Sequence, residues 1–351
     1  MSSSVLTAVS QQSINHRGHA YEAMHERMVK NLQLFFQTDN DIFLLTSSGT
    51  SGFETTVVNF FSPGDKILSF TCGEFGNRFA DCARAFHANV IQVKFPIGSA
   101  VSISDVEQTL NSHPDAKGIF FTHNETAVGV LNNLKSILPI VHAHPNQPLV
   151  CVDAVSSLGG VDLPMDNLGI DVLFTGSQKC WMAPPGICML SVSKKAWEFH
   201  KSAKNPRYYF DLDFFKKFDE KNQTPSTPAL ATLFGLDASL SHMAEVGRDA
   251  VFSHHQTLMH HTRNKIKKMG MKLFVADEDA SPTVTSIALP VGNDGSGWLK
   301  ELRETHHVVL AGGMGEAKGK ILRIAHMGYA VKKEEIDQAL EALEKVASRK
   351  E

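Results

Sequence analysis

Short apolar runs, each about the length of a β-strand, recur along this chain, and helical patterns separate most of them. The runs lie at about residues 42–45, 66–70, 90–95, 118–122, 149–152, 171–176 and 187–192. This alternation is typical of a mainly parallel sheet with helices on both faces. The last two runs are joined by a loop too short for a helical crossover, so we expect one antiparallel step there.

The second part of the chain predicts a smaller domain. Residues 229–246 and 250–269 have helical patterns, strands are expected near 283–289 and 320–325, and 333–346 form an amphipathic helix. A chain of 351 residues is typical of two domains. We therefore predict a large domain at 16–250 and a small α+β domain at 251–351, with residues 1–15 joining the small domain.

The charge and the apolar runs exclude several classes of partner. The formal net charge is -3 at pH 7, which offers no electrostatic attraction to nucleic acid or to a membrane surface. No apolar stretch approaches the ~18 residues of a membrane-spanning helix, and the polar amino terminus has no signal-peptide core. We expect a cytoplasmic protein without nucleic-acid or membrane partners.

The cysteines and histidines do not predict a metal centre. The cysteines are scattered without Cys-x-x-Cys spacing, which indicates reduced thiols: Cys72, Cys82, Cys151, Cys180 and Cys188. Paired histidines occur at 254–255, 260–261 and 306–307, but there is no His-Glu-x-x-His motif and no carboxylate at ligand spacing. We expect these histidines at the surface or at helix ends, and no metal ligands.

Lys179 is the strongest candidate for a catalytic residue. It follows an apolar strand and precedes Ala183-Pro-Pro-Gly186. Burial lowers the pKa of an amine, and a neutral amine can condense with an aldehyde. A solitary lysine in such a place is usually a surface or ion-paired residue, so the interpretation depends on the other motifs of the sequence. The implied aldehyde is pyridoxal phosphate. A protein that uses it also needs an acid for the ring nitrogen, donors for the phosphate, a surface that stacks on the ring and a cation for the substrate carboxylate.

Asp153 is the candidate acid for the pyridine nitrogen of such a cofactor. It ends the buried run 149–153, and open α/β sheets place ligands at the carboxyl ends of their strands. A carboxylate beside the ring nitrogen keeps it protonated, so that the ring can accept electrons. A helix N-cap is the alternative role for this residue.

A turn before a helix is the candidate phosphate site. Ser48, Gly49 and Thr50 lie between an apolar strand and a helical pattern at 53–61, and such a turn directs backbone N–H groups at one point. Gln178 would add a side-chain donor beside the lysine. A nucleotide P-loop motif does not occur in the sequence.

Two further residues complete the predicted site. Phe75 lies between glycines, and its ring could stack on the open face of the cofactor; an ordinary core aromatic is the alternative. Arg323 lies in an otherwise apolar strand, where its guanidinium could bind a substrate carboxylate through two hydrogen bonds. A structural ion pair is the alternative for Arg323.

These segments, in this order, resemble the class V pyridoxal-phosphate aminotransferases, most closely the alanine or serine to glyoxylate or pyruvate branch. The motifs that carry the resemblance are Ser-Gly-Thr at 48–50, Gly-Glu-Phe-Gly-Asn-Arg at 73–78, Thr-His-Asn-Glu-Thr at 122–126, Val-Asp-Ala-Val-Ser-Ser-Leu-Gly-Gly at 152–160, Gly-Ser-Gln-Lys at 176–179 with Ala-Pro-Pro-Gly at 183–186, and Leu-Arg-Ile at 322–324. The resemblance extends from about His16 to the C-terminal helix. It implies a fold-type I transferase with a seven-stranded, mainly parallel sheet and a smaller C-terminal domain.

The resemblance also implies roles for residues that the chemistry alone does not single out. Thr126 would contact the hydroxyl side of the cofactor ring, and Val155 would pack under the ring opposite Phe75. Residues 223–228 look like the family segment that crosses a homodimer interface, so Thr227, with Thr224, would reach the phosphate in the other subunit. The implied reaction moves an amino group from alanine or serine to glyoxylate or pyruvate in a ping-pong mechanism.

One feature departs from the family pattern. Relatives of this branch begin with a Pro-Gly-Pro segment that lies against the substrate, whereas this chain opens Met-Ser-Ser-Ser-Val5. Two alternatives therefore stay open beside the aminotransferase: a lyase or cysteine desulfurase of the same fold, and a catalytically weakened dimer without that substrate segment. No cysteine follows Cys188, which disfavours a desulfurase.

Overall fold

The central sheet of the large domain agrees with the predicted runs. A computed structural model of the protein describes residues 1–348. Its seven-stranded sheet has the order β1-β9-β8-β7-β4-β2-β3. The strands are β1 (Asp41–Thr46), β2 (Lys66–Thr71), β3 (Asn89–Lys94), β4 (Gly118–Thr122), β7 (Leu149–Asp153), β8 (Val172–Gly176) and β9 (Ile187–Val192). All seven coincide with the apolar runs to within one or two residues.

One strand of this sheet is antiparallel to its neighbours. β9 pairs antiparallel with both β8 and β1, while the other pairs are parallel. The predicted antiparallel step is thus confirmed, and residues 177–186 form the connection. β1 consequently runs in the same direction as β7 and β8, and its carboxyl end lies at the same edge of the sheet.

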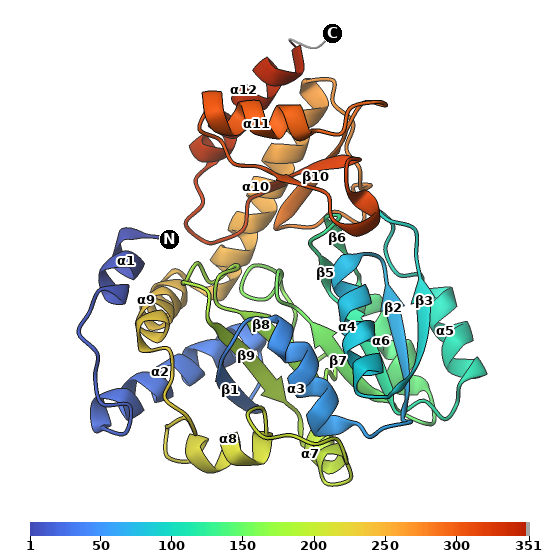
Figure 1. Ribbon diagram of the computed structural model, residues 1–351, viewed down its shortest axis with the longest axis vertical. Coiled ribbons are helices and arrows are strands. Elements are labelled where there is room, and N and C mark those ends of the chain that lie inside the picture. The colour runs from blue at the N-terminus through green and yellow to red at the C-terminus, as the bar shows by residue number, and fades with distance from the viewer. Residues whose placement is uncertain (349–351) are drawn as a thin grey trace.

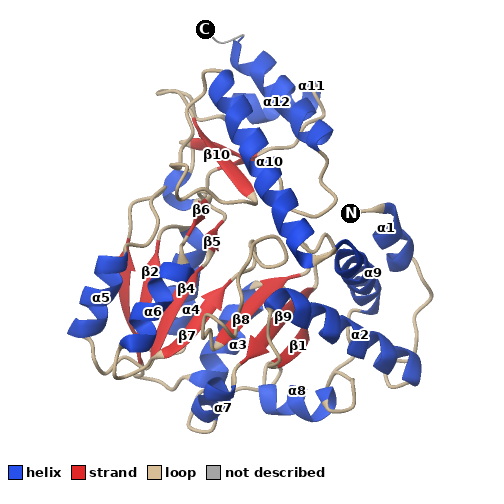
Figure 2. Ribbon diagram, turned by 180° about the vertical axis from the view of Figure 1, so that it is seen from behind, coloured by secondary structure: helices blue, strands red, loops and turns tan. Residues whose placement is uncertain are grey.

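Helices cover both faces of the sheet (Figures 1 and 2). The helices of this domain are α1 (Ser3–Val9), α2 (His19–Phe36), α3 (Thr50–Phe60), α4 (Glu74–Ala85), α5 (Ile103–Ser112), α6 (Leu134–Ala143), α7 (Lys194–His200), α8 (Leu212–Asp219) and α9 (Leu230–Val246). Alternate strand residues enter different cores: Leu44 belongs to the core that contains residues of α2, α5, α6 and α9, whereas Phe43 belongs to the core that contains residues of α3, α4, α7 and α8. Two buried faces explain why these strands are apolar throughout.

The small domain stands at one end of the large one. It contains α10 (Arg248–Lys268), β10 (Val284–Ala288), α11 (Ser296–Thr305), β11 (Ala311–Gly312), η1 (Gly315–Ala317), β12 (Ile321–Ala325) and α12 (Lys333–Ser348). α10 runs from the large domain into the small one (Figure 1), and it contributes Phe252 to one core and Ile266 to the other. The expected face of α12 is buried through Ile336, Leu340 and Leu343.

One segment differs from the expectations. Residues 1–15 were expected beside the small domain, but α1 packs against α9, and Ala8 belongs to a core of the large domain. Ala311 and Gly312 form β11, which pairs antiparallel with β12 beside Arg323. The boundary near residue 250 stays a prediction, and residues 349–351 of the predicted small domain lie outside the described residues.

A short hairpin lies between the central sheet and the small domain (Figures 1 and 2). It consists of β5 (Asn124–Glu125) and β6 (Val130–Leu131). Among residues 1–348, no helix combines the length and the apolar character needed to span a membrane.

Candidate active site

The predicted residues gather where the parallel strands end. β1, β7 and β8 end at Thr46, Asp153 and Gly176 on one edge of the sheet. The turn at 48–50 follows the first of these strands, and Lys179 follows the last. Open α/β sheets bind ligands at this edge, so the fold brings together groups that lie far apart in the sequence.

Lys179 lies in a turn whose backbone is held on both sides. Ser177 Oγ donates a hydrogen bond to the carbonyl of Pro184 at 2.6 Å, and the indole of the buried Trp181 donates to Thr175 Oγ1 at 3.1 Å. The half-buried Lys179 has a pKa below the usual value of a lysine, chiefly because burial disfavours its charged form. The nearby Arg323 acts in the same direction, while Cys180 and Asp153 oppose the shift. The amine is therefore easier to deprotonate than an exposed one.

Asp153 is buried, with 3% of its surface exposed. Its Oδ1 accepts a hydrogen bond from the backbone N–H of Val155 at 2.9 Å. Burial raises the pKa of its carboxyl to about 7, although this hydrogen bond and the charge of Lys179 lower it. The N-cap alternative is not realised, because residues 154–160 form turns rather than a helix. A buried carboxyl of this kind gains stability when a cation reaches it.

The turn at 48–50 opens α3 as expected. Gly49 is the N-cap of α3, and the side chains of Ser48 and Thr50 are exposed. A Cβ atom on Gly49 would lie 2.8 Å from Val155 Cγ2, so only glycine allows this close approach. The helix N-terminus therefore abuts the residue predicted to lie under the ring. Gln178 is exposed beside Lys179.

Phe75 occupies the first turn of α4 and is half-buried. The guanidinium of Arg78 lies 5.3 Å from the centre of its ring. The ring is thus held on one side by a cation and is not a fully enclosed core aromatic. Glu125 fixes the backbone of this turn: its Oε2 accepts from the N–H groups of Phe75 and Gly76 at 2.9 and 3.0 Å.

Arg323 points its guanidinium toward the hairpin of β5 and β6. Its Nε donates to the carbonyl of Gly312 at 2.8 Å, and its Nη1 donates to the carbonyl of Thr126 at 2.7 Å. Among the described residues no carboxylate lies within ion-pair distance of Arg323, so the structural ion pair is not formed. The Nη2 amino group stays available to a ligand. Thr126 also donates its hydroxyl to Ser156 Oγ.

Thr224 and Thr227 lie in a segment whose backbone accepts hydrogen bonds from Arg17. Arg17 donates through Nη1 to the carbonyl of Thr224 and through Nη2 to that of Pro225 at 3.0 Å. Thr224 is buried and donates its own hydroxyl to a neighbouring carbonyl, whereas Thr227 is exposed. The structure of one chain does not test the predicted contact of Thr227 with a second subunit.

Glu125 is the site residue that the sequence reasoning missed. It lies inside the quoted motif at 122–126 and is fully buried. Glu125 lies between the apolar residues 119–121 and 127–131, which indicates a buried carboxylate, and burying a carboxylate without partners is costly. Its partners, the N–H groups of residues 75 and 76, are about fifty positions away and could not be inferred from spacing.

The expectation for the paired histidines is wrong for His255. This residue is fully buried within α10, where its Nδ1 donates to the carbonyl of Val251 at 2.8 Å and its Nε2 accepts from the N–H of Gly328 at 2.9 Å. A neutral imidazole has one donor and one acceptor, and both are satisfied here. Burial lowers the pKa of His255 to about 4, which keeps the ring neutral.

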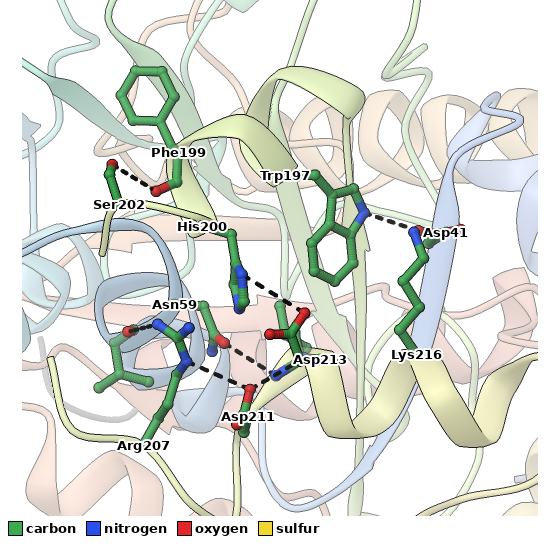
Figure 3. Close-up of polar contacts among 12 residues, drawn as sticks. Asp41, Asn59, Trp197, Phe199, His200, Ser202, Arg207, Asp211, Asp213 and Lys216 are labelled. Carbon is green, nitrogen blue, oxygen red and sulfur yellow. Dashed lines mark hydrogen bonds and ion pairs between the residues drawn. The ribbon is translucent and has the colours of Figure 1, made fainter. Parts of the chain in front are cut away.

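A second group of ligand-type side chains lies away from this edge (Figure 3). His200, Asp211 and Asp213 have nitrogen and oxygen atoms within 4.8 Å of one another. The Nε of Arg207 lies 3.4 Å from Asp211, and Asp211 also accepts from the N–H of Asp213 as the N-cap of α8. Arg207 already supplies the positive charge that these carboxylates need. We therefore interpret the group as a structural contact between α7 and α8.

Comparisons with known proteins identify the family. The sequence model of the family described as aminotransferase class V matches residues 3–338. The chain is 37% identical over 345 residues to the small subunit of a soluble hydrogenase from Synechococcus sp. (strain PCC 6716), covering 98% of this chain and 89% of that protein. It is 32% identical over 347 residues to alanine–glyoxylate aminotransferase of Rattus norvegicus, covering 97% and 83%.

A solved structure extends the likeness to the fold. Alanine–glyoxylate aminotransferase from Nostoc sp. matches with a TM-score of 0.93 and 29% identity, covering 98% of this chain and 92% of that one. The likeness therefore includes both domains as well as the edge where Lys179 and Asp153 meet. The chain belongs to the class V aminotransferase family and is a transaminase with the fold-type I architecture.

Proposed function

We propose that this transaminase uses pyridoxal 5′-phosphate to move an amino group from a small amino acid, alanine or serine, to glyoxylate or pyruvate. The observation that carries the proposal is the pair Lys179 and Asp153. One is an amine whose pKa is lowered, the other a carboxyl whose pKa is raised to about 7, and their charges interact at the same edge of the sheet. Relatives named for alanine–glyoxylate and serine–glyoxylate transfer support the substrate class.

The residues present fit this cofactor. The buried carboxyl of Asp153 has only one hydrogen-bond donor among the described residues, so a protonated ring nitrogen would satisfy it. The N-terminus of α3, with Ser48, Gly49 and Thr50, suits a phosphate dianion. Gln178 would add a side-chain donor to that phosphate. Phe75 and Val155 supply apolar surfaces for the two faces of a flat ring.

The chain's own groups would then divide the chemistry. Bound pyridoxal phosphate supplies an electron sink for the charge left when the α proton of the substrate is removed. Lys179 would hold the cofactor and, once displaced, its neutral amine would accept the α proton and return it. Arg323 would orient the substrate by binding its carboxylate through Nη2, while its other donors stay on Gly312 and Thr126. The donor leaves as a keto acid before the acceptor enters, which is the ping-pong order.

We also propose a homodimer with shared active sites. The support is the exposed position of Thr227 in a segment fixed by Arg17, together with the family resemblance of residues 223–228. Thr227, with Thr224 behind it, would contact the cofactor phosphate held by the other subunit. The cytoplasmic location stays a prediction from the sequence.

The test begins with Lys179→Ala. The wild-type protein loaded with pyridoxal phosphate should show a visible absorption band that changes on addition of alanine or serine without any keto acid. The variant should show neither the bound colour nor turnover, because no other amine replaces the lysine at the end of β8. Lys195→Ala, which removes a lysine paired with Asp171 on the far side of the sheet, is the control and should retain the band.

The same assay separates the alternatives. An aminotransferase forms product only when glyoxylate or pyruvate is supplied, whereas a lyase forms product without an acceptor. A screen of single amino acids by colour change identifies the donor. Retained cofactor with no colour change for any small amino acid would contradict the proposed activity and favour the weakened dimer.

A further inference from the structure

Glu125 is a buried acid that the chemistry proposed above does not use. It lies on β5 with none of its surface exposed. Its carboxylate accepts three backbone hydrogen bonds, from Phe75 and Gly76 on Oε2 and from Ala127 at 3.0 Å on Oε1. Three donors to one carboxylate are the kind of environment that makes burial of this charge tolerable.

Two of these donors belong to the first turn of α4. The N-cap of α4, Gly73, has no side chain to satisfy the free N–H groups of that turn. Glu125 therefore acts as the cap from another element, and its negative charge also suits the positive end of the helix. A Cβ atom on Gly73 would lie 2.5 Å from Glu125 Cγ, so the glycine makes room for this contact.

The same turn carries Phe75, the ring that covers the cofactor in the proposed function. The backbone N–H of Phe75 donates one of the two hydrogen bonds that Glu125 accepts from α4. Thr126, the residue that follows β5, accepts a hydrogen bond from Arg323 through its carbonyl oxygen. A single short segment thus fixes the aromatic cover on one side and the arginine for the substrate on the other.

The electrostatic surroundings agree with a role inside the site. Burial raises the pKa of Glu125 to about 7, with Asp153 adding to the shift and the backbone hydrogen bonds opposing it. Glu125 in turn favours the charged form of Arg323, whose pKa is lowered chiefly by burial. The acid therefore interacts with two ionisable groups of the predicted site, Asp153 and Arg323, and is not an isolated core residue.

We propose that Glu125 is a positioning residue that holds Phe75 over the cofactor ring by capping α4. This inference rests on the proposed function, since it takes Phe75 as the stacking residue. Glu125 touches neither cofactor nor substrate in this account and acts only through the position of the first turn of α4.

A double-mutant cycle on the cofactor-free protein tests the proposal. The substitutions are Glu125→Gln, Phe75→Ala and both together, and the readout is the dissociation constant of pyridoxal phosphate followed by absorbance. Glutamine keeps the size of the side chain but removes its charge from the N-terminus of α4, and in either orientation its NH2 group faces a backbone N–H, that of Ala127 or those of Phe75 and Gly76. We expect Glu125→Gln to weaken cofactor binding by roughly tenfold. In the Phe75→Ala background it should have almost no further effect.

Two further variants keep the result interpretable. Ser102→Ala removes the cap of α5, where Ser102 Oγ accepts from the N–H of Asp105, and should lower stability to urea without changing cofactor affinity. If Glu125→Gln does not fold, Gly73→Ala displaces the carboxylate instead and should give the same coupling with Phe75.

Three outcomes are decisive. Effects of Glu125→Gln and Phe75→Ala that multiply in the double variant, or an unchanged affinity in Glu125→Gln, would overturn the proposal while leaving the transaminase intact. An unchanged affinity in Phe75→Ala would overturn both the stacking role and the proposal. The loss of bound colour in Lys179→Ala tests the cofactor itself independently of these results.

Discussion

At the scale of single residues, the site combines groups whose pKa values are shifted by burial toward their uncharged forms. Lys179 is more easily neutral and Asp153 more easily protonated than the same residues in water. Neither arrangement serves the folded chain alone, because each retains a cost of desolvation that a packed apolar residue would not have. Such costs concentrate at functional sites, and two of them here fall on residues that the sequence motifs mark.

Asp153 predicts a pH dependence of the cofactor-free protein. The pKa of this carboxyl rises from 3.8 to about 7 on folding because of burial. The folded state holds the proton more tightly than the unfolded chain, so stability is lost as the pH rises from about 4 through 7. Asp153→Asn keeps an acceptor for Val155 and removes this loss. We expect the free energy of unfolding of the variant, relative to that of the wild type, to increase by about 1.4 kcal/mol per pH unit between pH 5 and pH 7.

Urea unfolding at several pH values measures this difference. Saturation with pyridoxal phosphate supplies the control, because the ring nitrogen then compensates the carboxylate and the wild type should become the more stable of the two. A difference between the two cofactor-free proteins that stays constant with pH would contradict the assignment of the shift to Asp153.

At the scale of elements, the positions of the strands along the chain are largely predictable from the sequence. Strands buried on both faces are continuous apolar runs, so their positions and the antiparallel step were predictable. The same logic found Asp153 and Lys179, because functional groups follow strand ends. Glu125 and Arg17 were not predictable in this way, since their partners at 75–76 and 223–225 meet them only through packing. Neither the position of α1 on α9 nor the burial of His255 has a local signal.

The contact of α3 with β8 predicts an effect on stability. Gly52 lies within α3, and a Cβ atom there would lie 2.3 Å from Cδ2 of Phe174 on β8. Helix propensity alone would favour alanine at this position by about 1 kcal/mol. We expect Gly52→Ala to destabilise the protein instead, by roughly 1 to 3 kcal/mol, because the ring has no free space to move into.

The free energy of unfolding in urea checks this expectation, with Glu107→Ala on the exposed side of α5 as the control. The phosphate turn at 48–50 begins the same helix, so Gly52→Ala should also weaken cofactor binding. A variant as stable as the wild type would show that α3 and β8 are not packed as tightly as the structure has them.

At the scale of the whole molecule, the proposed dimer makes each active site depend on two chains. A site would take Lys179 from one subunit and Thr227 from the other. Lys179→Ala and Thr227→Asp should therefore each inactivate their own homodimers. The first lacks the amine, and the second places a carboxylate beside the phosphate held by the other subunit, which repels that dianion. Thr227 is exposed in the single chain, so its substitution should not disturb folding of the protomer.

Heterodimers of these two variants distinguish a shared site from a separate one. Co-expression with two affinity tags isolates a dimer in which one site combines the intact Lys179 of the Thr227 variant with the intact Thr227 of the Lys179→Ala chain. If sites are shared, this heterodimer should recover about half of the wild-type activity per dimer, because one of its two sites is complete. If each site is built from one chain, both sites stay defective and no activity returns. Failure of the two tags to purify together would instead contradict the dimer, and the exposed segment at 223–228 would need another explanation.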